Sequence, residues 1–222
     1  MKNVVLEPNN MAGDVVVQYT ETKVITKNLD IVVPLQYKAF VYIDEKISFR
    51  VESCNQKNVV KEYSKQYGDK LLGHAIKVAY ILDKSLPQMM WGFGNINVAN
   101  KTLNESYRVG ANGKVTFKVT DYTKLMNAFP LDKPITIDDI HEKSISSIKA
   151  VGGPSLNKFV MDSNKSVFEL NSLAGDFRKV MEKSVKDERI FNILGIEMVE
   201  LTVDGIHVNE EDVEEIRNRI NN

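Results

Sequence analysis

The chain has 222 residues, and its 29 basic and 30 acidic side chains give a formal net charge of -1. This balance excludes the strongly basic composition of a protein that binds nucleic acid over a large surface. Hydrophobic residues make up 43% of the chain, which excludes wholesale disorder and suffices for one large domain or two small ones. The one cysteine, Cys54, excludes an internal disulfide, and we expect an ordinary small side chain in a reducing compartment.

Neither a signal peptide nor a membrane span is predicted. The apolar run Val4–Leu6 is far too short for the core of a signal peptide. The longest uncharged stretch, Ser85–Asn100, is interrupted by proline, glycine and asparagine, so it does not predict a helix that crosses a bilayer. Any membrane contact is therefore expected to be peripheral, or supplied by a region outside this sequence.

Short apolar segments in the first half of the chain predict β-strands. Residues 1–14 are expected to be a loose lead-in. Strands are predicted at residues 15–17, 24–26 and 30–33, where Pro34 ends the last of them. Residues 37–43 and 47–51 predict a hairpin across Asp44–Lys46, and alternation over residues 76–82 predicts a further strand. The polar segment 52–69 has no clear pattern.

Two glycine-containing segments predict turns. Met89–Phe93 and Ile96–Val98 are expected to form one hairpin. Tyr107–Val109 is expected to pair with Val115–Val119 across Gly110–Gly113. Neither segment is followed by the Lys-Ser/Thr of a phosphate-binding loop, so turns are favoured over phosphate binding.

Helical spacing dominates after Asp121. Helices are predicted at residues 121–129, 136–150, 166–170 and 173–185, with a break or kink at Gly152-Gly153-Pro154. Leu156, Phe159 and Val160 are expected to resume a helical face after the break. The apolar face of the last helix consists of Leu173, Phe177, Val180, Met181 and Val185, and Gly195 ends the helical region.

Ile196–Val208 is predicted as a strand whose apolar face contains Val199, Leu201 and Val203. Strands followed by helices predict an α+β fold with mainly antiparallel strands in the first half and helices packed on the sheet in the second.

The last residues predict a charged helix that begins at Asn209 as N-cap. Acidic residues in its first turn suit the helix dipole, and Glu215 and Arg219 have the spacing of an ion pair. Val213, Ile216 and Ile220 have the three- and four-residue spacing of a coiled-coil seam and form the candidate oligomer interface. The alternative is a helix that packs back on its own domain.

Candidate catalytic and ligand-binding residues are scarce. The three histidines, His74, His141 and His207, share no metal-ligand spacing. Thr136 and Asp139 have the spacing of a capping box, which is favoured over acid–base catalysis. We therefore predict no catalytic residue, no cofactor and no metal site.

Met89, Met90, Trp91 and Phe93 gather soft and aromatic side chains in an uncharged stretch. An exposed patch of this kind would suit a membrane interface or a protein partner. The alternative is a buried hairpin, so the four residues are candidate contact residues.

Several segments, in order, resemble a known family. They are residues 13–19, 24–26, 31–44, 78–81, 90–92, 113–122 and 173–213. Together they resemble the SPFH, or Band 7, domain of stomatins, prohibitins and flotillins, and in particular its bacterial virion core protein-like branch. The matching segments extend over nearly the whole chain.

The resemblance implies an SPFH-like domain over residues 15–208 and the start of a helix or coiled coil over residues 209–222. It also implies a non-enzymatic scaffold that forms homo-oligomers, lies peripherally on the cytoplasmic face of a membrane and recruits membrane proteins. A soluble monomeric adaptor remains an alternative. A hydrolase with an unrecognised site is a third possibility.

Overall fold

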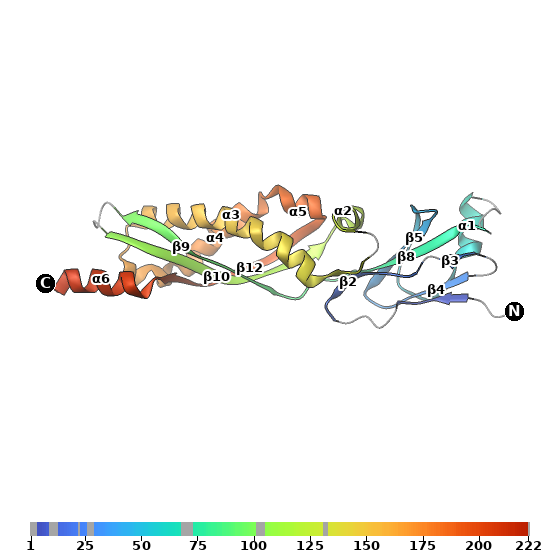
Figure 1. Ribbon diagram of the computed structural model, residues 1–222, viewed down its shortest axis with the longest axis horizontal. Helices are drawn as coiled ribbons and strands as arrows, with labels where there is room; N and C mark the ends of the chain where they lie inside the picture. The colour runs from blue at the N-terminus through green and yellow to red at the C-terminus, as the bar shows by residue number, and fades with distance from the viewer. Residues whose placement is uncertain are drawn as a thin grey trace. The chain divides into compact units, whose positions relative to one another are not determined.

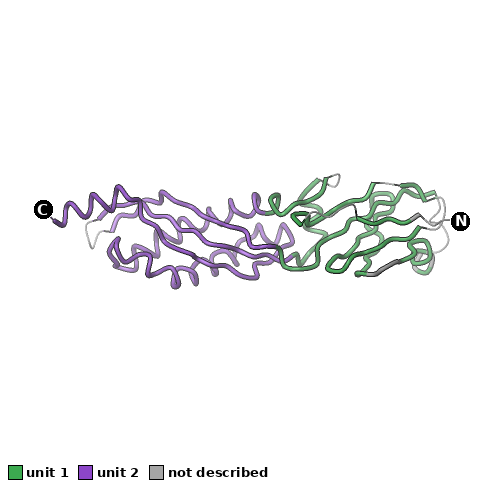
Figure 2. Tube along the Cα trace, turned by 90° about the horizontal axis from the view of Figure 1, so that it is seen from below, with its two compact units in different colours: residues 1–86, 119–140 green, residues 87–118, 141–222 purple. Residues whose placement is uncertain are grey.

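The computed structural model describes residues 4–8, 13–21, 23–25, 29–67, 73–100, 105–130 and 133–221. These residues form an α+β structure with several antiparallel pairings, as predicted. The chain divides into two compact units, shown in different colours in Figure 2. Unit 1 consists of residues 1–86 and 119–140, and unit 2 of residues 87–118 and 141–222.

Unit 1 contains a three-stranded sheet in the order β1-β4-β7 and a six-stranded sheet in the order β11-β2-β8-β5-β6, with β3 paired to β8. The strands and helices are β1 (Val4–Leu6), β2 (Val15–Tyr19), β3 (Lys23–Val24), β4 (Leu29–Val33), β5 (Tyr37–Ile43), β6 (Lys46–Val51), β7 (Cys54–Asn58), α1 (Val59–Tyr67), β8 (Ala75–Leu82), α2 (Tyr122–Asn127) and β11 (Ile135–Thr136). In the described ranges, β1 and β4 pair in parallel, and the other pairings of unit 1 are antiparallel.

The core of unit 1 draws apolar side chains from both of its sheets. Ile31 of β4, Val41 of β5 and Val78 of β8 are completely buried in it. Helix α2 packs against neighbouring side chains of β5: the Tyr42 hydroxyl donates to the Met126 sulfur over 2.9 Å, and burial raises the pKa of Tyr42 to about 12. Because core side chains and α2 contact successive residues of β5, five consecutive residues of this strand, Ala39–Ile43, are buried.

The predicted hairpin of unit 1 is confirmed. Strands β5 and β6 pair with Ile43 opposite Lys46, and the two turn residues Asp44 and Glu45 have φ angles of 47° and 65°. Two successive positive φ angles are typical of the type I′ turn, whose twist matches that of the flanking strands.

Two predictions for unit 1 are corrected. The expected lead-in contains β1, whose Leu6 is buried in the core, while residues 9–12 lie outside the described ranges. The segment without a clear pattern contains β7 and α1, and residues 68–69 lie outside the described ranges. Helix α1 places only Val59, Val60 and Tyr63 against the core, which is too few apolar side chains for a recognisable stripe. Strand β3 includes Val24 of the predicted strand 24–26, and Thr26 lies outside the described ranges.

Unit 2 contains a three-stranded sheet in the order β12-β10-β9 and several helices (Figure 1). Its elements are β9 (Met89–Asn100), β10 (Glu105–Val119), α3 (Ile137–Ser163), the 3₁₀ helix η1 (Val167–Leu173), α4 (Ala174–Lys186), α5 (Arg189–Leu194), β12 (Ile196–Val208) and α6 (Glu210–Asn221). Val119 and the first residues of α3 belong to unit 1.

Both predicted glycine turns in unit 2 are wrong. Strand β9 is continuous and pairs with β10 from Met89 opposite Val115 to Asn100 opposite Glu105. A Cβ at Gly113 would lie 1.9 Å from the carbonyl oxygen of Thr202 in β12, and a Cβ at Gly110 would lie 2.6 Å from that of Phe93 in β9. These glycines therefore allow backbones to approach closely within the sheet and do not form turns.

The predicted helix break is also wrong. Helix α3 continues through Gly152-Gly153-Pro154 for 27 residues. A Cβ at Gly152 would lie 2.3 Å from the Phe93 ring, and one at Gly153 would lie 3.1 Å from Ile96. The glycines let the helix lie close to β9, and this packing outweighs the local tendency of glycine and proline to end a helix.

Most other helix predictions are confirmed. Asp121 caps α2, and Thr136 and Asp139 form a reciprocal capping box. Phe177, Met181 and Val185 of α4 are buried, and Gly195 ends α5 with a φ of 66°.

Strand β12 has the predicted bounds, but its predicted apolar face is wrong. Val199 is 56% exposed, because the alternation of buried and exposed residues shifts by one position between Met198 and Leu201.

No helix in the described part of the chain is long and apolar enough to cross a membrane.

Candidate functional site

The candidate interface residues of α6 differ in their exposure. Ile216 is 2% exposed, Val213 is half-buried, and Ile220 is 65% exposed. The stripe therefore begins against unit 2 and ends in solvent. The middle of the helix packs on its own unit, as in the alternative considered above, and Ile220 near its end is exposed. The described residues form no coiled coil.

Asn209 fixes the start of α6. Its side-chain oxygen accepts hydrogen bonds from the backbone N–H groups of Glu211 over 3.1 Å and Asp212 over 3.4 Å. Its own backbone N–H donates to the carbonyl oxygen of Arg108 in β10 over 2.9 Å. The predicted N-cap is thus confirmed, and it ties the helix to the neighbouring strand.

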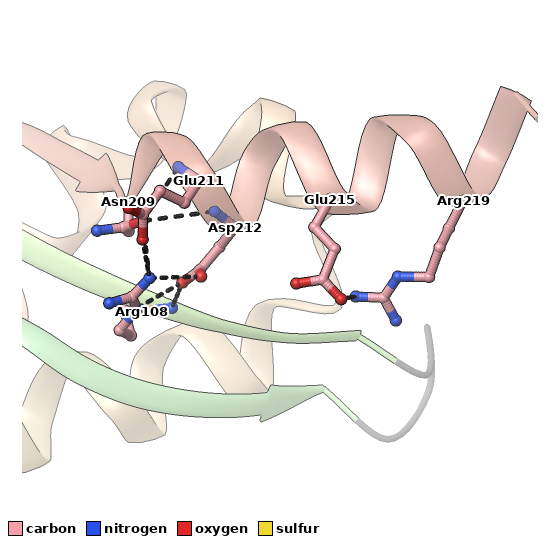
Figure 3. A network of polar contacts seen from close by, with 6 residues as sticks. All are labelled: Arg108, Asn209, Glu211, Asp212, Glu215 and Arg219. Carbon is pink, nitrogen blue, oxygen red and sulfur yellow. Dashed lines mark hydrogen bonds and ion pairs between the residues drawn. The ribbon is translucent and has the colours of Figure 1, made fainter.

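Arg108 of β10 reaches the first turn of α6 (Figure 3). Its guanidinium donates to Asp212 through Nε over 3.0 Å and through Nη2 over 2.8 Å. The same group contacts Asn209 over 2.9 Å and Glu211 over 3.0 Å, and the Arg108 backbone N–H donates to Asp212 over 2.6 Å. We call Arg108, Asn209, Glu211 and Asp212 the Arg108 network.

Charge pairing governs the electrostatics of this network. The hydrogen bonds that Arg108 donates hold the pKa of Asp212 below its ordinary value, and the acceptors Asp212 and Glu211 raise the pKa of Arg108. The side chain of Arg108 is 37% exposed and that of Asp212 is 15% exposed, so water and salt screen the pairing in part. The network therefore orients α6 and makes a modest, salt-sensitive contribution to its docking.

The far end of α6 has a different surface. Glu215 and Arg219 form the predicted ion pair over 3.3 Å, as Figure 3 shows. Arg217 lies over the ring of Phe168 in η1, 5.8 Å from its centroid. Phe168 is 50% exposed and Ile220, one turn beyond Arg217, is 65% exposed. Apolar surface thus remains open to solvent near the end of the helix.

No protein-family model matches the chain, and no curated protein matches it in sequence.

A shallow hollow of about 390 Å³ lies beside the Arg108 network. Its lining includes Gly92, Gly94, Gly110, Arg108, Asn112 and His207. His207 contacts Asn112, and Arg108 is paired with the carboxylates of Glu211 and Asp212.

The predicted membrane or partner patch is not assembled as one exposed surface. Met89 is 5% exposed and Trp91 is 2% exposed, and the ring of Phe93 faces Gly152 of α3. Met90 alone among the four is largely exposed, at 63%. Strand alternation separates the four side chains, since neighbouring residues face opposite sides of β9.

The histidines take part in local hydrogen bonds. His74 contacts Asp44 over 2.5 Å and holds the pKa of that carboxyl below its ordinary value, and His141 contacts the carbonyl oxygen of Met90 over 2.7 Å. Across the described residues, no group of three or more His, Cys, Asp or Glu side chains is arranged to hold a metal ion. The side chain of Cys54 lies outside the described part.

A second cluster of titratable groups lies in unit 1. Lys38 contacts Asp83 over 2.9 Å and the Tyr122 hydroxyl over 3.3 Å. The hydrogen bond to Asp83 raises the pKa of Lys38, which keeps the amine protonated and unsuited to nucleophilic attack. The cluster instead joins α2 to β5 and the end of β8.

Sequence reasoning did not identify Arg108. The residue alternates with Tyr107 and Val109 in a half-exposed strand, where a charged side chain is ordinary. The available signal was the acidic first turn of α6, Glu210 to Asp212, which would attract a cation from elsewhere in the chain.

Proposed function

We propose that the protein is a non-enzymatic scaffold that assembles through α6 with copies of itself and recruits membrane or membrane-associated proteins. The observation that carries the proposal is Ile220, which is 65% exposed on a helix whose start is fixed by the Arg108 network. Ile220 continues the apolar stripe of Val213 and Ile216, so α6 carries apolar side chains at the spacing of a helix–helix seam.

Peripheral membrane association on the cytoplasmic face is the second part of the proposal. It rests on the resemblance to SPFH domains over the segments named above. Linked copies would bind a membrane more tightly than one copy, because many weak contacts add up once the first has formed.

A soluble monomeric adaptor is the alternative that a specific observation favours. Ile216 is already buried within the chain, as expected if α6 is simply the last helix of its unit. The hydrolase possibility has less support, because the polar clusters described above consist of charge-paired or hydrogen-bonded side chains.

Light scattering over a concentration series tests self-assembly. The intact chain is compared with a chain truncated after Val208 and with Ile220→Glu. The matched control is Ile193→Glu, which changes an isoleucine that is 53% exposed on α5. We expect the intact chain and the Ile193→Glu variant to form large assemblies, and the truncated chain and Ile220→Glu to remain monomers.

A monomer for all four proteins would favour the adaptor. Assemblies that survive both truncation and Ile220→Glu would place the interface elsewhere. Flotation with anionic lipid vesicles tests the membrane part separately: the assembled protein should float, and an assembly that stays in the dense fraction would remove that part of the proposal.

A further inference from the structure

The apolar surface of α6 is too small to serve two purposes at once. Among residues 210–221 its apolar side chains are Val213, Ile216 and Ile220, and they form one stripe. Ile216 is 2% exposed and Val213 is half-buried, so unit 2 already covers most of the stripe. A surface that is buried against its own unit cannot also pack into the seam of a helix pair.

The Arg108 network holds α6 in this covered position. Its contacts all lie in the first turn of the helix, on the N-terminal side of Ile216. On the C-terminal side of Ile216, the contact between Arg217 and the Phe168 ring holds the helix. Releasing the stripe therefore requires two losses. Arg108 must lose its charged hydrogen bonds, and Ile216 must lose its burial against unit 2.

We propose that the docked α6 is an autoinhibited state and that Arg108 sets the balance between docking and self-assembly. The inference rests on the proposed self-assembly through α6. In the docked state only Ile220 is open, which is one contact and too little for a stable pair of helices. After release, Val213, Ile216 and Ile220 together face a second copy, so docking and assembly compete for the same stripe.

The network is suited to this role because water and ions can reach it. Glu211 is 84% exposed and Arg108 is 37% exposed, so solvent and salt reach the pairing without unfolding the core of unit 2. Raising the ionic strength should therefore weaken docking before it weakens the apolar contacts of an assembled helix pair.

Arg108→Ala in the full chain tests the inference. Asp212→Asn is the second variant, because it removes the paired charge and preserves the side-chain shape. Arg178→Ala is the matched control, since Arg178 forms an exposed pair with Glu182 over 2.9 Å on α4, away from the network. Light scattering gives the concentration at half-assembly, and hydrogen exchange of the α6 amides reports docking.

We expect Arg108→Ala and Asp212→Asn to lower the concentration at half-assembly on the order of tenfold and to speed exchange in α6 of the monomer. Arg178→Ala should change neither quantity. Adding Ile220→Glu to Arg108→Ala should abolish the gain in assembly, because a charge then interrupts the released stripe.

Three results would overturn the inference. Faster exchange in α6 with unchanged or weaker assembly would mean that the docked helix is the assembling form. Unchanged exchange in both variants would mean that Arg108 does not hold the helix. An increase in assembly that persists with Ile220→Glu would mean that the stripe is not the interface. If the intact chain assembles and truncation after Val208 prevents it, the proposed function stands even where the autoinhibition fails.

Discussion

The central strands of the two units are buried in different ways. In unit 1, β5 has five successive buried residues, whereas in unit 2, β10 alternates between buried and accessible residues over most of its length. Core side chains and α2 contact β5 from both faces, while β10 turns one set of side chains inward and the other, including Arg108, towards solvent. A strand that keeps one face open can supply polar side chains for recognition, and a strand buried on both faces cannot. The contrast directs the search for an interface to unit 2.

The largest expected effect concerns the close approach of strands in unit 2. Gly113→Ala would place a Cβ against the Thr202 carbonyl oxygen and the Trp91 ring, so β10 and β12 would have to separate. We expect a loss of about 3 kcal/mol or more in the free energy of unfolding, measured by chemical denaturation. Gly94→Ala is the control, because its Cβ would meet nothing within 4 Å. Equal losses for the two would contradict the packing role of Gly113.

Substitution of neighbouring residues tests the difference in burial directly. In β8 of unit 1, Tyr80 and Ile81 are both completely buried, so Tyr80→Ala and Ile81→Ala should each cost about 3 kcal/mol. In β10, Phe117→Ala should cost about as much, because its ring is buried against Phe191 at a centroid distance of 5.0 Å.

Lys118 is exposed, so Lys118→Ala should change the free energy of unfolding by less than about 0.5 kcal/mol. Denaturation curves measure the free energy of unfolding of the four variants, which are Tyr80→Ala, Ile81→Ala, Phe117→Ala and Lys118→Ala. A large cost at Lys118, or a negligible cost at either Tyr80 or Ile81, would show that the contrast between the strands is mistaken.

The smallest expected effect is the acid sensitivity of the Arg108 network. Arg108 lowers the pKa of Asp212 below its ordinary value of 3.8, so the contribution of the pair is complete above that pH. It is lost as the pH falls through the lowered value and Asp212 takes up a proton. Arg108→Ala should therefore lower the free energy of unfolding slightly near neutral pH, and by less in acid once Asp212 is protonated. Denaturation of both proteins across this range measures the difference, and a constant difference would rule out the ion pair as its source.

Local patterns predicted a large part of the fold. The hairpin at Asp44–Lys46, the N-cap Asn209 and the helix end at Gly195 depend on residues a few positions apart. Such elements are predictable because the hydrogen bonds and dihedral angles that define them lie within one turn of the chain.

The mistaken predictions share one physical cause. Gly110, Gly113, Gly152 and Gly153 have the local chemistry of turns and helix ends. Their role here is set by Phe93, Ile96 and Thr202, which approach from other elements. A Cβ at Gly110, Gly113 or Gly152 would clash with them, and one at Gly153 would lie 3.1 Å from Ile96. The position of the candidate site was hidden in the same way, since Arg108 precedes its partner Asp212 by 104 residues.

The sequence by itself therefore determined the α+β class, most helix and strand positions and the N-cap of α6, because these follow from periodicity and short-range hydrogen bonding. Only the tertiary structure decided that the glycines lie inside strands and a long helix, that Trp91 is buried, and that Arg108 docks α6. Those outcomes depend on contacts between residues far apart in the chain, and close packing selects them over the local preference of each segment.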